Sequence, residues 1–181
     1  ETGSRVTGTY GNHAWEPDAS QVINALWENR FKIDRTAGLA PATGWLPRLK
    51  YRVIARLPRA LQDGPSTTLV VGPYGDVVVR PDATAYFSWY PLGLRGWSEE
   101  LAPPDSWNPA CRGELAPDER RSVARALLDA IDEWYPGAAQ AEPLLVDAGA
   151  SVAYGRTDVG DVKSGLHDRT HCGVTWVDGY H

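Results

Sequence analysis

From Leu49 to Trp89 the sequence carries one strand pattern after another and no helical pattern. Apolar and mostly basic side chains alternate between Leu49 and Leu57, which is typical of a strand with one buried face and one polar face. The further strand patterns are Thr67–Val71, Val77–Arg80 and Thr84–Trp89, the last two forming a hairpin around Pro81-Asp82-Ala83. Because no helix separates these strands, they indicate an antiparallel meander and not a series of βαβ units.

The strongest helical pattern runs from Pro117 to Tyr135. Val123, Leu127 and Ile131 recur at helical spacing, and proline suits the first turn of a helix. An amphipathic helix of this length needs an apolar surface to cover. We therefore expect an α+β fold, in which a mixed, mostly antiparallel sheet of about six strands carries this helix across one face.

The two ends of the chain point to a fragment. Glu1-Thr2-Gly3-Ser4 resembles a processing scar left by a secretory expression route, so we expect a single domain over residues 5–181. A predicted hairpin turn at Asp178-Gly179 lies at the very end of the sequence, which we interpret as truncation at the C-terminus.

Composition limits the partners and the source. The net charge is -5 without a basic stripe, and no window holds the roughly 20 apolar residues that a membrane span requires. Nucleic acid and membrane are therefore not expected as partners. Arginine far outnumbers lysine, and alanine, glycine and proline are abundant. This composition is typical of GC-rich bacterial genes, so we expect a parent protein in the bacterial cytoplasm.

The cysteines and histidines give no firm site. Cys111 and Cys172 could form one disulfide or remain free thiols, and the sequence does not decide between the two. His167 and His171 have a metal-ligand spacing only if their segment is helical, and the glycines and aspartates around them favour a loop. We predict no metal site.

A buried strand beginning at Leu144 leads to Gly155-Arg156. Glycine lets a ligand approach the backbone, and the planar guanidinium of arginine pairs with both oxygens of a carboxylate. Arg156 is therefore a candidate carboxylate ligand. The alternative is a surface arginine in a turn.

The order of these elements resembles the glycine/D-amino-acid-oxidase-like FAD-dependent oxidoreductases. Val22-Ile23-Asn24-Ala25 resembles the strand by which those chains return to the flavin domain, and Leu49–Leu57 resembles the start of their substrate domain. The helix ending at Tyr135-Pro136 and the strand leading to Arg156 fall where the family has similar elements. The Gly-x-Gly-x-x-Gly motif that binds the FAD pyrophosphate does not occur in this sequence.

The resemblance implies a substrate-binding domain of an oxidoreductase that acts on an amine or amino acid, inactive without its flavin domain. FAD would belong to the full-length parent, with no cofactor expected in this fragment. The partners would be a small carboxylate or amine substrate and the rest of the flavoenzyme chain. Asn24 and Ala25 would lie near the cofactor and Arg156 would hold the substrate carboxylate. The candidate wall residues of the substrate site are Tyr51, Tyr86, Tyr90 and Tyr154.

Two other functions stay open. The first is a non-catalytic module that binds a protein, peptide or glycan through Trp-rich loops, with Trp97, Trp107 and Trp176 as anchors. It requires these tryptophans to form one exposed patch. The second is a hydrolase or metalloenzyme, which requires two of its histidines to converge on an aspartate. The residues concerned are His13, His167, His171, Asp158, Asp161 and Asp168.

Overall fold

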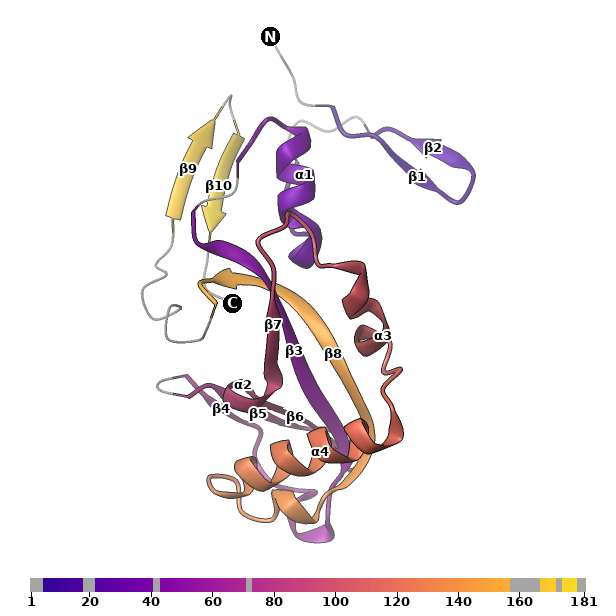
Figure 1. Cartoon of the computed structure of the whole chain (residues 1–181), viewed down its shortest axis with the longest axis vertical. Coiled ribbons are helices and arrows are strands. Elements are labelled where there is room, and N and C mark those ends of the chain that lie inside the picture. The colour runs from indigo at the N-terminus through magenta and orange to yellow at the C-terminus, as the bar shows by residue number, and fades with distance from the viewer. Residues whose placement is uncertain are drawn as a thin grey trace.

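The computed structural model describes residues 5–17, 22–40, 43–70 and 73–156, together with the backbone of 167–171 and 174–178. Two long strands, β3 (Trp45–Arg56) and β8 (Glu142–Tyr154), lie side by side through the length of the molecule, and the longest helix crosses them near one end (Figure 1). The mostly antiparallel α+β class expected from the sequence is confirmed.

β3 organises the main sheet, whose six strands pair antiparallel throughout. β8 pairs with β3 along the whole length of one edge. The other edge is shared, because β6 pairs with the C-terminal part of β3 and β7 with its N-terminal part. The remaining strands continue outward from β6 in the order β6-β5-β4. Their bounds are β4 Thr67–Leu69, β5 Gly75–Val79, β6 Thr84–Trp89 and β7 Leu94–Trp97.

The hydrophobic core lies between one face of this sheet and α4 (Pro117–Asp132). The alternation read from the sequence explains the sheet side: the odd-numbered residues from Leu49 to Ala55 are buried against the helix. On the helix side, Leu127 and Ile131 are fully buried. Full burial of one such side chain contributes about 1.5–3 kcal/mol, so this interface holds the domain together.

The helix stops at Asp132, where the sequence predicted Tyr135. The Asp132 carboxylate accepts hydrogen bonds from the backbone N–H groups of Gly137 and Ala139 at 2.8 and 3.0 Å, and Gly137 adopts a positive φ of 100°. The Tyr135 hydroxyl donates to the Pro65 carbonyl at 3.0 Å. These bonds fix a turn in place of the last helical residues.

The N-terminal part packs separately. Phe31 of α1 (Arg30–Thr36) forms a second small apolar cluster with Trp45 and Val152. Before α1, a hairpin of β1 (Gly8–Tyr10) and β2 (His13–Trp15) extends away from the body with every residue exposed (Figure 1). The other short elements are α2 Tyr90–Gly93, α3 Asn108–Cys111 and 3-10 turns at Trp27–Asn29, Arg59–Leu61, Asp105–Trp107 and Ala138–Gln140.

Three local predictions were wrong. The buried strand expected around Val22–Asn24 is irregular chain, and Ile23 is 88% exposed. The segment Pro91–Gly113, expected to be loop, contributes β7 to the main sheet. Asp178 lies within β10 (Val174–Asp178), which pairs with β9 (His167–His171), while Gly179 lies outside the described residues. None of the described helices has the length and apolar character that a bilayer span requires.

Candidate functional site

The face of the sheet that α4 does not cover carries a cavity of about 450 Å³, called here the β3 cavity. Its volume lies within the range of roughly 300–1,000 Å³ typical of small-molecule sites. The polar, even-numbered side chains of β3 point into it, as alternation along a strand requires. The lining residues used below are Arg48, Lys50, Arg52, Asp76, Tyr86, Tyr90, Gly149 and Ser151.

Strand pairing sets the order of groups across this face. Arg52 lies opposite Asp147 of β8, Lys50 lies opposite Gly149, and Arg48 lies opposite Ser151. Three basic residues therefore follow one another along β3, and each has a different neighbour on β8. Successive residues on one face of a strand are separated by about 6.6 Å, so the three charges belong to one site.

Two of the three basic side chains are held by the protein itself. The Arg52 guanidinium makes a two-pronged ion pair with Asp147, with N···O distances of 2.6 and 2.9 Å, and this hydrogen-bonded pairing raises the pKa of Arg52. Arg48 is only 2% exposed and donates to the backbone carbonyls of Tyr154 and Gly155, the latter at 2.9 Å. Arg48 thus connects β3 to the end of β8.

Lys50 is placed differently. Its Nζ lies 3.4 Å from the centre of the Tyr90 ring, a cation–π contact worth about 0.5–2 kcal/mol. Its neighbour across the strand pair is a glycine, and a Cβ placed on Gly149 would meet no atom within 4 Å. The ammonium group therefore stands beside open space within the cavity.

Tyrosines and an acid complete the wall. Tyr90 also packs edge-on against Tyr74, with ring centres 5.8 Å apart. Burial raises the pKa of the Tyr86 hydroxyl, and the nearby carboxylate of Asp76 adds to that effect. Tyr86 is therefore a neutral hydrogen-bonding group at physiological pH, and Asp76 supplies a negative charge in the same cavity.

The predicted wall tyrosines divide between the two faces of the sheet. Tyr86 and Tyr90 line the β3 cavity. Tyr51 lies on the opposite face in the hydrophobic core, so it does not line this cavity. Tyr154 packs edge-on against Trp45, with ring centres 6.2 Å apart, at the far end of β8.

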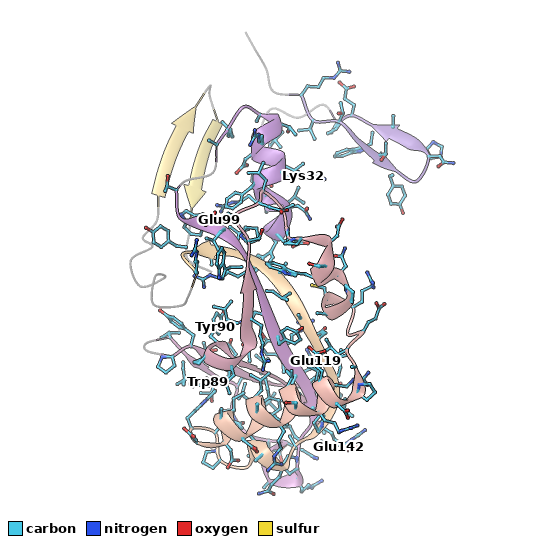
Figure 2. The ribbon with its side chains drawn as sticks, in the orientation of Figure 1. Lys32, Trp89, Tyr90, Glu99, Glu119 and Glu142 are labelled. Atoms are coloured by element: carbon cyan, nitrogen blue, oxygen red, sulfur yellow. The ribbon has the colours of Figure 1, made fainter. Side chains whose placement is uncertain are left out.

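Arg156 lies beside β7 at a second cavity of about 480 Å³, whose lining also includes Tyr90, Arg95 and Trp97. Its guanidinium stacks 3.8 Å from the Trp97 ring centre and pairs with Glu99 at 2.6 Å. Tyr90 and Glu99 lie toward opposite ends of β7 (Figure 2). Because Tyr90 lines both cavities, the two sites are neighbours, yet Arg156 does not line the β3 cavity.

The residues expected near a cofactor have internal roles. The Asn24 amide donates to the Arg30 carbonyl at 3.0 Å and to Asp34 at 2.7 Å, and its oxygen accepts from the Leu26 N–H. Ala25 is exposed. These residues form no cradle for a pyrophosphate, so the described part of the chain does not by itself fit FAD.

Sequence reasoning missed Arg48, Lys50 and Arg52 as a site. The available signal was three basic residues at alternate positions of one strand, on the side away from the helix. We had interpreted that side as a solvated polar face. Gly149 gave no sign of its role, because its position opposite Lys50 depends on pairing between strands distant in sequence.

The other candidate chemistry gains no support. Within the described residues, no group of three histidine, cysteine or acidic side chains could hold a metal ion. Cys111 is a free thiol, and burial raises its pKa. Cys172, Asp158 and Asp161 lie outside the described residues, as do the side chains of β9 and β10, including Trp176.

Comparisons of the chain with protein-family models, with curated proteins and with solved structures find no match. The site is therefore interpreted on its geometry alone.

Proposed function

We propose that this chain is the substrate-binding domain of an FAD-dependent oxidoreductase acting on an amine or amino acid, and that the substrate binds in the β3 cavity. The observation that carries the proposal is the joint presence of Arg48, Lys50 and Arg52 with Tyr86 and Tyr90 in one cavity. Cations and tyrosine hydroxyls suit a carboxylate, and the aromatic rings suit an apolar side chain.

The charges of the cavity fit this class of ligand. A carboxylate ligand is favoured on the β3 side by the basic residues, and an ammonium group is favoured by Asp76 on β5. The Arg52–Asp147 pair brings no net charge, since each member neutralises the other. It fixes the direction of the Arg52 side chain and so shapes the wall beside Tyr86, whose ring centre lies 5.7 Å from the guanidinium carbon.

The chemical step belongs to the flavin domain of the parent. A flavin supplies hydride acceptance, and this chain would supply binding and orientation of the substrate. We accordingly expect this chain alone to be inactive as an oxidoreductase. The residues that we assign to substrate binding are Lys50, Tyr86 and Tyr90, with Arg156 as a second candidate at the neighbouring cavity.

The alternative, a non-catalytic module that binds through its tryptophans, has less support. Trp107 packs against the core, whereas Trp97 is 42% exposed and lies under Arg156. These two side chains do not form one exposed apolar patch.

The test uses the full-length parent protein. Its visible spectrum is expected to show the two bands of an oxidised flavin near about 370 and 450 nm. A carboxylate substrate should then be oxidised with a raised KM in Lys50→Gln, because the charged contact is lost, while Arg125→Gln on the exposed face of α4 serves as the control. A folded, colourless parent would remove the oxidoreductase proposal.

A further inference from the structure

The cavity contains a more specific feature than its overall charge. At the level of Lys50, the strand pair has a long cationic side chain on β3 and no side chain on β8. Gly149 is not held by the need for a left-handed backbone, since its φ lies outside that region, and no neighbouring atom would meet a Cβ there. Neither backbone conformation nor packing in the described structure therefore requires a glycine at this position.

We propose that the anionic group of the ligand lies over Gly149, between Ser151 and the ammonium group of Lys50, and that Gly149 determines specificity by leaving this space open. The inference rests on the proposed function in one respect, that the ligand is a substrate bearing a carboxylate.

The neighbouring positions favour this place over the rest of the strand. The level of Arg52 is occupied by Asp147, whose carboxylate would repel a second anion. The level of Arg48 is closed, because that side chain is almost fully buried and donates to two backbone carbonyls. Only between these two levels does a cation of β3 face a position without a side chain on β8.

Lys50 can hold an anion in its present position. An ammonium group carries three N–H donors, so it can donate to a carboxylate while its charge remains over the Tyr90 ring. The hydroxyl of Ser151, two residues along the same face of β8, adds a neutral donor at the edge of this space. Lys50 would thus contact the ligand directly, and Gly149 would act by its small size.

The experiment measures binding of two small probes to this chain by isothermal titration calorimetry. The first, 3-phenylpropanoate, has a carboxylate; the second, 2-phenylethylamine, has an aromatic ring of the same kind and no anionic group. The variants are Gly149→Val, Gly149→Ala, Lys50→Gln and Lys50→Arg. Valine suits a strand, so Gly149→Val is expected to fold, which urea unfolding checks.

We expect Gly149→Val and Lys50→Gln to weaken 3-phenylpropanoate binding by about tenfold or more, the loss typical of one charge-assisted contact. Lys50→Arg should keep most of the affinity, and Gly149→Ala should give an intermediate loss. Binding of 2-phenylethylamine should change by less than about twofold, because it does not use this space.

The outcomes separate the two claims. If Gly149→Val binds 3-phenylpropanoate as tightly as the unmodified chain, the Gly149 inference is wrong and the proposed function is unaffected. If the unmodified chain binds no carboxylate, both claims fail. If the parent contains no flavin but Gly149→Val abolishes carboxylate binding, the proposed oxidoreductase role fails and the anion site stands.

Discussion

At the scale of single residues, Lys50 and Arg52 show how position within one strand sets the role of a charge. Both point to the same cavity from β3, but Arg52 faces Asp147 across the strand pair and Lys50 faces Gly149. A buried guanidinium paired with a carboxylate mainly fixes local geometry. A cation beside an open space can attract a ligand, so the two residues are expected to respond differently to mutation.

Tyr86 gives a prediction for pH. Burial raises its pKa in the folded state above the ordinary value near 10, and Asp76 adds to the shift. The stabilisation associated with the neutral phenol is therefore present below about pH 10 and is lost as pH rises through the folded-state pKa. Tyr86→Phe removes this titration.

The check is urea unfolding between about pH 9 and 11. The unmodified protein should lose stability across this range by more than Tyr86→Phe does, so that the difference between the two narrows as pH rises. Equal pH dependence of the two proteins would show that Tyr86 ionises as readily in the folded chain as in the unfolded one.

At the scale of elements, the two sides of the sheet differ in how much room they leave. A Cβ on Gly75 of β5 would lie 2.6 Å from the Trp89 ring and 3.0 Å from the Trp134 ring, whereas one on Gly149 of β8 would contact nothing. The rings of Trp89 and Trp134 pack with centres 5.7 Å apart and anchor β6 near the end of α4. Gly75 is the small residue that this packing requires.

Gly75→Ala is therefore expected to reduce the free energy of unfolding by about 1–3 kcal/mol, the usual cost of overpacking. The matched control, Gly149→Ala, should change it by less than about 0.5 kcal/mol. Chemical denaturation of both variants measures the difference. Similar stabilities would mean that the tryptophan pair shifts at little cost.

The sequence predicted those elements whose signal is local. Alternation from Leu49 to Leu57 identified β3 and its polar face, and the apolar spacing from Val123 to Ile131 identified α4. β7 was missed because a four-residue strand containing Gly96 has too little periodicity to recognise. The pairing of β3 with β8 was also beyond reach, since its register joins residues about a hundred positions apart.

The candidate site was harder to predict for the same reason. Tyr86 and Tyr90 were named and line the β3 cavity, whereas Tyr51 was placed on the wrong face because its strand was recognised but its orientation toward the helix was not applied to it. The juxtaposition of Lys50 with Gly149 exists only in the paired sheet.

At the scale of the whole molecule, the account claims that the sheet face opposite α4 is a binding surface for a carboxylate ligand. The core fills one face of the sheet, and the polar face remains hollowed and cationic. Backbone amide NMR spectra of this chain, recorded during titration with 3-phenylpropanoate, locate the binding site without assuming any residue in advance.

The predicted result is that the largest shifts fall on Lys50, Gly149 and Ser151, with smaller ones at Tyr86 and Tyr90. The amides of α4, on the other side of the sheet, should stay unchanged. Shifts confined to Arg95, Trp97 and Arg156 would move the site to the neighbouring cavity, and shifts elsewhere, or none at saturating ligand, would contradict the account.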